Sequence, residues 1–464
     1  MTKRTKLTKR IKLILGVVTV LLFAASGVIQ AQFFFARDPG VRGGAAGAGD
    51  PIAGLTASEL VFFEAGKKDF EEAEGVGDGL GPRFNLDSCA GCHTHPAVGG
   101  TSPAVNPQVS VASAFGARNV VPSFITLTGP IREARFKFKP DGTRDGGVHN
   151  LFVISGRKDS SGDASDCNIA QDNFGVELSR HNVIFRIPTP VFGAGLIELI
   201  PDSAIVANLS TNTSQKSALG IFGRTNRISG NPNNNGNDGT IARFGWKAQN
   251  KSLLLFAGEA YNIEMGISNE LFQTERDETP TCQFAVHPND VTNTDGATGL
   301  DTVSAIEKFS SFMRFLAPPT PSPDTPGGVQ SIARGRQVYR AIGCAYCHTP
   351  TLKTCNSTVA ALRNQEVNLL SDLALHQMGP GLADNILQGE ARGDEFRTAP
   401  LWGLGQRIFF LHDGRTTDLV EAIRAHKSSG NPRFGPSEAN EVINNFNALR
   451  ESGKQDLLNF LRSL

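Results

Sequence analysis

The chain has 464 residues, with 45 Lys and Arg against 45 Asp and Glu, so its formal charge at pH 7 is zero. This length is enough for two or three domains with sizeable cores. The sequence contains no basic stripe, which excludes an electrostatic surface for nucleic acids. Seven cysteines is a modest number, and free thiols tend to pair in an oxidising compartment.

Residues 1–31 have the pattern of a secretory signal peptide. The stretch MTKRTKLTKRIK contains six Lys and Arg and no acid, an apolar run follows it, and Ala31 offers a small residue for cleavage. The apolar run has about 17 residues, the lower limit for a membrane span, so an uncleaved anchor is the alternative that we favour less. We expect a periplasmic or otherwise exported protein without a stable membrane span after cleavage. The mature chain would carry 39 basic residues (45 minus 6) against 45 acidic ones.

Two segments of the chain share one plan, a helical pattern followed by C-x-x-C-H. The first ends in CAGCH at 89–93 and the second in CAYCH at 344–348. This repetition indicates an internal duplication. The Pro-rich stretch at 317–328 separates the two units and is the best domain boundary in the chain.

The C-x-x-C-H spacing suits covalent attachment of haem, because two thiols can form thioethers and the next His can coordinate iron. A redox dithiol would need a βαβ context, which the sequence does not predict here. A shared zinc site would join motifs 255 positions apart (344 minus 89), and each His suits haem better. We therefore expect two covalently attached haem c groups. The attachment residues are Cys89, Cys92, Cys344 and Cys347, and the proximal iron ligands are His93 and His348.

Between the motifs, residues 151–316 are rich in Gly, Asn, Asp and Ser, which predicts loops with a few short strands and some helix. The run NPNNNGNDG lacks the acidic spacing of an EF-hand, so we interpret it as a solvated turn. The predicted fold is mainly α, with two cytochrome c-like haem domains and a long loop-rich insertion that contains a few short strands. Its segments are a signal peptide (1–31), an N-terminal haem domain (32–150), the insertion (151–316), the Pro-rich linker (317–328) and a C-terminal haem domain (329–464).

Several blocks of the sequence resemble the bacterial di-haem oxidoreductase family, relatives of the di-haem cytochrome c peroxidases. These blocks are GLGPRFNLDSCAGCHTHPAVGG, FRIPTPVFGAGLIELIPD, ARFGWKAQNKSLLLFAGEAYNIEMGISNELF, SDLALHQMGPGLAD and FRTAPLWGLGQRIFFLHDGRTTDLVEAI. The resemblance extends from about residue 57 to the end of the chain. It implies an enzyme that takes electrons at the C-terminal haem from a small cytochrome c or cupredoxin and reduces peroxide, or a similar small oxidant, at the N-terminal haem. A non-catalytic electron-transfer cytochrome and an oxygenase or protein-modifying oxidase are the alternatives.

Whether the sixth coordination position of each iron is open or occupied distinguishes a catalytic haem from an electron-transfer haem, because peroxide can bind only at an open position. For the C-terminal haem, His426 lies on the apolar face of a predicted helix. The resemblance places a distal ligand there, after the HDG motif. Met378, in a Gly- and Pro-rich loop, is the other candidate, and we favour His426. For the N-terminal haem we expect an open position, because His95 is too close to His93 to reach the opposite face and Met265 fits the core better.

Cleavage of a peroxide needs a group that moves a proton between its oxygens and a donor that stabilises the leaving oxygen. Glu133, flanked by Arg132 and Arg135, lies in a segment that resembles the one with the distal acid in di-haem peroxidases. We predict Glu133 and Arg132 as catalytic residues, with a solvated salt-bridge cluster as the alternative. His149 is a weaker candidate.

Three cysteines remain after haem attachment, Cys167, Cys282 and Cys355. One disulfide would leave an odd thiol, and the pairing of Cys167 with Cys282 is one of those that the sequence leaves open. Trp402 lies in RTAPLWGLGQ, which resembles a haem-interface block of the peroxidases that also supplies calcium ligands. The extra residue in this block argues against calcium. We interpret both Trp402 and Trp246 as core residues.

Overall fold

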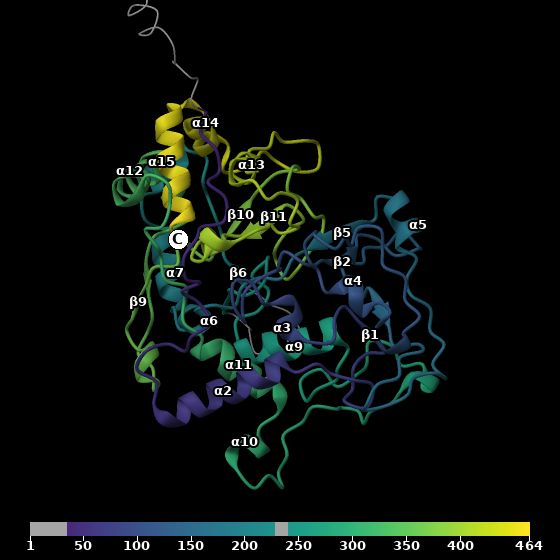
Figure 1. Ribbon diagram of the computed structural model, residues 1–464. Coiled ribbons are helices and arrows are strands. Elements are labelled where there is room, and N and C mark those ends of the chain that lie inside the picture. The colour runs from purple at the N-terminus through teal and green to yellow at the C-terminus, as the bar shows by residue number, and fades with distance from the viewer. Residues whose placement is uncertain (1–34, 228–239) are drawn as a thin grey trace, which may run out of the picture.

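The computed structural model describes residues 35–227 and 240–464, which form many short elements joined by long loops (Figure 1). The signal-like segment and the NPNNNGNDG run lie outside the described residues. The fold is mixed, 32% helical and 11% strand, so the prediction of a mainly α protein is wrong. The reason lies in the 50 glycines and 25 prolines, which interrupt regular elements along most of the chain.

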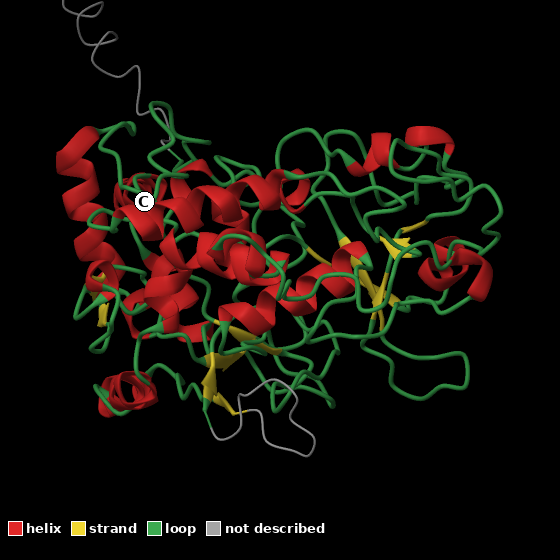
Figure 2. Ribbon diagram, turned by 90° about the horizontal axis from the view of Figure 1, so that it is seen from below, coloured by secondary structure: helices red, strands yellow, loops and turns green. Residues whose placement is uncertain are grey.

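The helices differ widely in length, and those nearest the two motifs are single turns. The α-helices of the described residues are α2 (Ala57–Glu71), α3 (Cys89–Cys92), α4 (Gln108–Val111), α5 (Phe174–Ser179), α6 (Ala194–Glu198), α7 (Asp202–Leu209), α8 (Thr213–Ala218), α9 (Leu253–Met265), α10 (Gly299–Thr302), α11 (Ala305–Phe315), α12 (Gly328–Ala341), α13 (Leu419–Ala425), α14 (Asn440–Ala448) and α15 (Glu451–Arg462). The 3₁₀ turns are η1 (Ala114–Gly116), η2 (Pro280–Cys282), η3 (Cys344–Tyr346), η4 (Ala360–Leu362) and η5 (Leu404–Gln406). Figure 2 shows the helices gathered on one side of the molecule and a loop-rich part on the other.

The strands pair in small antiparallel sheets. A three-stranded sheet has the order β3 (Val148–His149), β2 (Glu133–Phe136) and β5 (Val183–Arg186), with Glu133 opposite Arg186. The two-stranded sheets are β1 (Arg83–Phe84) with β4 (Phe152–Val153), β6 (Asn226–Arg227) with β7 (Ile241–Ala242), β8 (Leu352–Lys353) with β9 (Glu366–Val367), and β10 (Leu375–Gln377) with β11 (Glu395–Arg397).

The same helix crossing occurs once beside each C-x-x-C-H motif. The helix before the first motif, α2, packs against α11 at Gly66, where a Cβ atom would lie 2.1 Å from Lys308 O. The helix before the second motif, α12, packs against α15 at Gly335, where a Cβ atom would lie 2.0 Å from Asp456 O. Only glycine permits so close an approach of two backbones. The internal repeat in the sequence therefore corresponds to a repeated packing arrangement.

Local signals fix the ends of the helices that support the first motif. Thr56 and Glu59 form a capping box at the start of α2, with Glu59 N donating to Thr56 Oγ1 at 3.2 Å. The helix α9 ends at Gly266, whose φ of +81° is left-handed. A Cβ atom on Gly266 would lie 2.5 Å from Arg83 O. Glycine at this position therefore lets the end of α9 pack tightly against the strand β1.

Buried apolar side chains form separate cores around the two motifs. The largest core includes Phe63, Phe70 and Phe312 and packs against both cysteines of the first motif. A second core includes Phe446 and Phe460 and packs against Cys344 of the second motif. A smaller cluster, of Ile187, Trp246, Met378, Leu382, Phe396 and Phe409, joins residues from both parts of the chain.

The Pro-rich segment 317–328 is fixed by hydrogen bonds along its length. Ala317 N donates to Asp50 O at 3.0 Å, and Thr320 N donates to Gly47 O at 2.8 Å. Ser322 N donates to the carbonyl of the penultimate residue of the chain at 2.8 Å. The segment is therefore an ordered connection between the two units that contain the C-x-x-C-H motifs.

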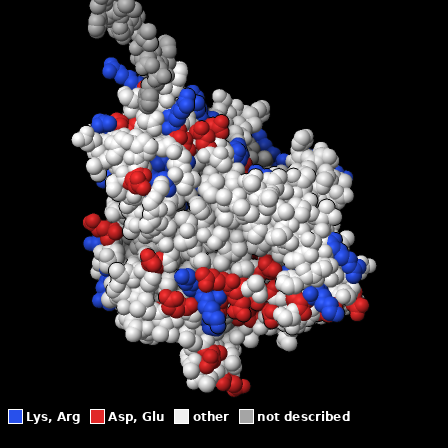
Figure 3. Space-filling model, viewed as in Figure 1, with Lys and Arg blue, Asp and Glu red and all other residues white. Residues whose placement is uncertain are grey.

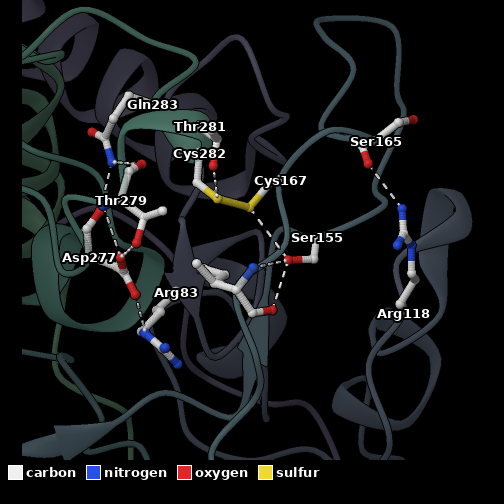
Figure 4. Close-up of a disulfide and its surroundings, with 11 residues drawn as sticks. Arg83, Arg118, Ser155, Ser165, Cys167, Asp277, Thr279, Thr281, Cys282 and Gln283 are labelled. Atoms are coloured by element: carbon white, nitrogen blue, oxygen red, sulfur yellow. Dashed lines mark hydrogen bonds and ion pairs between the residues drawn. A yellow bond between two sulfur atoms is a disulfide. The ribbon is translucent and has the colours of Figure 1, made fainter.

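A disulfide joins Cys167 to Cys282, 115 residues further along the chain, and confirms one of the pairings that the sequence left open (Figure 4). Both cysteines are buried, and Ser155 Oγ lies 3.4 Å from Cys167 Sγ. Cys355 is a free thiol. The cross-link stabilises the loop-rich part of the chain, where regular elements are short.

Charged side chains are unevenly spread over the face seen in Figure 3. Asp and Glu gather over and beside α2, and the face above them is largely uncharged. In the part of the chain that the structure describes, no helix is long and apolar enough to cross a membrane.

Candidate functional site

Two large cavities each enclose one C-x-x-C-H motif. The first surrounds about 1110 Å³ of empty space and the second about 1350 Å³, and both figures include space that is open to solvent. The first is lined by Cys89, Cys92 and His93, and the second by Cys344, Cys347 and His348.

The histidines of the two motifs are anchored in the same way. His93 Nδ1 lies 3.0 Å from Gly100 O, and His348 Nδ1 lies 3.1 Å from Leu370 O. An Nδ1–H group that donates to a carbonyl leaves Nε2 with a free lone pair, which is the tautomer that coordinates metals. Burial lowers the pKa of each imidazole to about 4, so both rings are neutral at pH 7.

The motif cysteines are unpaired thiols in apolar surroundings. Burial raises the pKa of Cys89 well above its ordinary value and that of Cys344 to about 12. Redox dithiols have lowered pKa values, and zinc ligands bind as thiolates, so these surroundings suit neither role. Unpaired, protonated thiols are compatible with thioether formation.

Both residues predicted as a distal ligand, His426 and Met378, line the second cavity. His426 follows α13, and its Nδ1 lies 2.8 Å from Ala422 O, so its Nε2 is also free. Burial lowers the pKa of His426, and its charge in turn lowers the pKa of His348. Met378 is buried after β10. The structure brings both candidates together with His348, and the shared mode of anchoring favours His426.

The predicted catalytic residues Glu133 and Arg132 line the first cavity with His93. Glu133 is the first residue of β2 and accepts a hydrogen bond from Arg135 Nε at 2.5 Å. Burial lowers the pKa of Arg132, and its buried Nε atom has no hydrogen-bond partner among the described residues. The carboxylate of Glu133 is therefore committed to an ion pair, whereas Arg132 keeps a free donor.

A second carboxyl group, which the sequence reasoning missed, lines the same cavity. In the described ranges, the side chain of Glu264 on α9 has neither a hydrogen bond nor an ion pair. Burial raises its pKa to about 8, and the neighbouring charges of Glu133 and Glu259 contribute to this shift. Phe256 and Ala260, eight and four residues earlier, line the cavity from the same helix face. An acid in an otherwise apolar stripe is the signal by which the sequence could have identified Glu264.

Two methionines also line the first cavity. Met265 Sδ is 3.7 Å from Cys89 Sγ, at the edge where a thioether would form. Met313 lies one turn after Phe309 on α11, and Phe309 belongs to the aromatic group that packs against the ring of His93. Of the described residues, no second histidine lines this cavity.

The remaining candidate histidines are held away from the first cavity. His95 Nε2 lies 2.7 Å from Gln406 O, which links the first motif to the C-terminal part of the chain. The ring of His149 lies between Asp172 Oδ2 at 2.8 Å and Asp145 Oδ2 at 3.1 Å. His149 is not among the described residues that line the cavity, so the structure does not bring this weaker candidate to the site.

One tryptophan contacts both large cavities. Trp246 is buried, its Nε1 donates to Ile187 O at 2.9 Å, and it lines the first and the second cavity. Trp402 lines a smaller cavity of about 590 Å³, which shares Trp246 with both of the others. We call this smaller cavity the junction. Both tryptophans belong to or contact apolar clusters, as expected for core residues, and Trp246 also separates the two motif sites.

Over residues 35–227 and 240–464 no group of three or more His, Cys, Asp or Glu side chains is arranged to hold a metal ion. The block RTAPLWGLGQ, which raised the question of calcium, runs from β11 to η5.

Residues 138–464 match the family described as "Di-haem oxidoreductase, putative peroxidase". The chain belongs to this family. Family membership implies two haem groups and an oxidoreductase of the peroxidase-like kind. The residues present fit two haems, because each large cavity combines a pair of free thiols with a neutral, anchored imidazole.

Solved structures with similarity to this di-haem oxidoreductase cover much of its chain at low sequence identity. Hydrazine synthase of Kuenenia stuttgartiensis is 13% identical, with 89% of this chain and 90% of that chain covered and a TM-score of 0.36. A MauG-like protein associated with microbial copper homeostasis is 20% identical, with coverages of 60% and 90% and a TM-score of 0.30. The diheme peroxidase BthA from Burkholderia thailandensis is 14% identical, with coverages of 60% and 86% and a TM-score of 0.27. Among curated proteins, none matches the chain significantly.

Proposed function

We propose that this di-haem oxidoreductase reduces a peroxide at its N-terminal haem with electrons that it receives at its C-terminal haem. The observation that carries this proposal is the difference between the two cavities. The first contains an unpartnered carboxyl group, Glu264, and a free guanidinium donor on Arg132, both suited to proton transfer and to stabilising charge. The second contains an additional anchored imidazole, His426, suited to a six-coordinate electron-transfer haem.

Each haem would be held by thioethers to the two cysteines of its motif and by the histidine that follows them. Cys89, Cys92 and His93 would hold the N-terminal haem. Cys344, Cys347 and His348 would hold the C-terminal one, with His426 rather than Met378 as its sixth ligand. The position of each half-buried thiol pair beside its histidine in the same cavity supports this assignment.

The haem would supply electrons and a site at which peroxide can bind. Reduction of hydrogen peroxide consumes two electrons and two protons and yields two molecules of water, so the protein must deliver and redistribute protons. The ionised carboxylate of Glu264 accepts the proton from one peroxide oxygen and returns it to the other as the O–O bond breaks. Arg132 donates a hydrogen bond to the leaving oxygen, and Arg135 donates a hydrogen bond to Glu133 nearby.

Electrons would pass between the cavities through the region of Trp246, since this side chain lines both. The donor would be a small soluble carrier, a cytochrome c or a cupredoxin. The predicted signal peptide supports export to the periplasm. The two helix crossings at Gly66 and Gly335 support the proposal of two cytochrome c-like domains, although α11 of the first crossing lies within the segment 151–316 that we predicted as an insertion.

The spectrum of the purified protein tests this proposal directly. We expect two haems per chain, one with a high-spin ferric signal that changes when cyanide or peroxide is added and one low-spin signal that does not. Two low-spin signals that remain unchanged with both reagents would contradict a peroxidase function and favour a simple electron carrier. The variant Trp246→Phe should slow the electron transfer between the haems after rapid reduction, while leaving both spectra intact.

A further inference from the structure

Two arginines, one buried (Arg397) and one half-buried (Arg407), lie where the junction meets the second cavity. Arg397, on β11, and Arg407, directly after η5, line both of these cavities. Arg397 donates through Nε to Gly245 O at 2.9 Å and through Nη1 to Thr398 O at 3.4 Å. Neither of these acceptors is charged, so the positive charge of Arg397 is not balanced by its hydrogen bonds.

The guanidinium group of Arg407 is still less satisfied. Within the part of the chain that the structure describes, it has neither a hydrogen bond nor a carboxylate partner. Burial lowers the pKa of Arg407 and of Arg397 to about 10, and the charge of Arg407 contributes to the shift of Arg397. Two neighbouring cations that are shielded from solvent lower the stability of the folded protein unless an anion lies between them or beside them.

The surrounding protein does not provide that anion. No Asp or Glu is among the described residues that line the junction. Glu438 lines the second cavity, but its Oε2 lies 2.8 Å from His376 Nδ1 and accepts the backbone N–H groups of Phe222 and Gly223. Its carboxylate is thus fully used, and the balancing anion must come from a bound group.

A haem in the second cavity would bring two carboxylates to this place. The propionates of a haem extend from the edge opposite its vinyl groups, and the vinyl edge would be fixed at Cys344 and Cys347. Planar guanidinium groups bind carboxylates in a bidentate manner, which Lys cannot reproduce. We propose that Arg397 and Arg407 bind the propionates of the C-terminal haem and so turn its propionate edge towards Trp246 and the first cavity. This inference rests on the haem attachment proposed above.

The test uses the complete holoprotein and the variants Arg407→Leu, Arg407→Lys and Arg397→Gln. Arg340→Leu is the matched control, because Arg340 is exposed at the end of α12 and lines neither the junction nor the second cavity. The haem content is measured first, by the pyridine haemochrome spectrum. If the wild-type protein lacks two covalently bound haems, the proposed attachment fails, and this result is separate from the behaviour of the arginine variants.

Two measurements then report on the propionates. Resonance Raman spectroscopy follows the propionate bending mode, which responds to hydrogen bonds on the carboxylates, and redox titration gives the midpoint potential of each haem. The haem whose spectrum changes in His426→Ala identifies the C-terminal one. We expect Arg407→Leu to shift the bending mode of that haem and to lower its equilibrium constant for reduction about tenfold, which is ~59 mV for one electron.

The conservative variant separates direct binding from a distant charge effect. Arg407→Lys keeps the positive charge but loses the bidentate geometry, so it should recover most of the potential and still shift the bending mode. A bending mode that is unchanged in Arg407→Leu, Arg407→Lys and Arg397→Gln would overturn the proposal. So would shifts confined to the N-terminal haem, or shifts of equal size in Arg340→Leu.

Discussion

The role of Glu264 leads to the sharpest prediction about activity. Its pKa of about 8 lies well above the ordinary value of 4.5, which corresponds to a preference of roughly 5 kcal/mol for the neutral form. At pH 7 only about one molecule in ten therefore carries the ionised base. If the ionised carboxylate takes the first proton from peroxide, the second-order rate constant should rise about tenfold per pH unit and level off near pH 8.

The variant Glu264→Gln removes this base while preserving the size of the side chain. General acid–base catalysis commonly contributes about 10²- to 10⁴-fold, so we expect a rate loss in that range together with loss of the pH dependence. The assay is stopped-flow mixing of the reduced protein with hydrogen peroxide between pH 5 and 9. The control is Glu366→Gln, at an exposed residue of strand β9, which should react like the wild type.

Glu133 provides a second, independent check of the same reasoning. In Glu133→Gln a negative charge that raises the pKa of Glu264 is removed, and Arg135, which lowers it, loses its partner. The pH profile should therefore move to lower pH, on the order of one unit for a charge a few ångströms away, with the plateau largely kept. If Glu133→Gln abolishes the reaction and Glu264→Gln reacts normally with an unchanged profile, then Glu133 is the proton-transfer group and our assignment is wrong.

Three further predictions concern the second haem and the stability of the fold. His426→Ala should convert one low-spin EPR signal to high spin, whereas Met378→Ala should leave both signals unchanged; the opposite pattern would transfer the ligand role to Met378. Replacing Cys167 and Cys282 together with Ala removes a cross-link over 115 residues and should lower the free energy of unfolding by about 2–5 kcal/mol in urea denaturation, and an unchanged midpoint would refute this. Burial opposes protonation of His149, but its two aspartate partners outweigh this effect and raise its pKa. The stabilisation of the folded state by His149 is therefore complete below the unfolded-state pKa near 6.5, and it is lost as the pH rises through the raised folded-state pKa. The variant His149→Gln should consequently lower the melting temperature more at pH 5 than at pH 9.

The sequence predicted the repeated motif units because their signals are local. Five adjacent residues define each C-x-x-C-H motif, and the helix before each one has a clear apolar pattern. The disulfide could not be predicted in this way, because the sequence is compatible with any of the three pairings among Cys167, Cys282 and Cys355. Only the folded chain brings the first two together across 115 residues.

The functional residues that the sequence did not reveal share one property: the role of each depends on the residues that surround it in the folded protein. Glu264 resembles an ordinary helical acid until β2 places the charge of Glu133 near it. Arg397 begins the block RTAPLWGLGQ and Arg407 follows it, but the sequence does not show that both line one cavity that has no Asp or Glu among its described lining residues. The content of regular structure was overestimated because a helical pattern near each motif does not extend into the Gly- and Pro-rich loops that fill most of the chain.

The two helix crossings at glycine allow the chain lengths of the two halves of this protein to be compared. The crossing at Gly335 joins helices within residues 328–462, whereas the crossing at Gly66 joins helices within residues 57–315. The extra chain, including the disulfide, therefore lies within the unit that contains the first C-x-x-C-H motif and Glu264, and the other unit is short. A gene duplication followed by expansion of one copy would produce this asymmetry. Sequence changes in relatives could then accumulate in the expanded copy, while the helix packing of the short copy stayed the same.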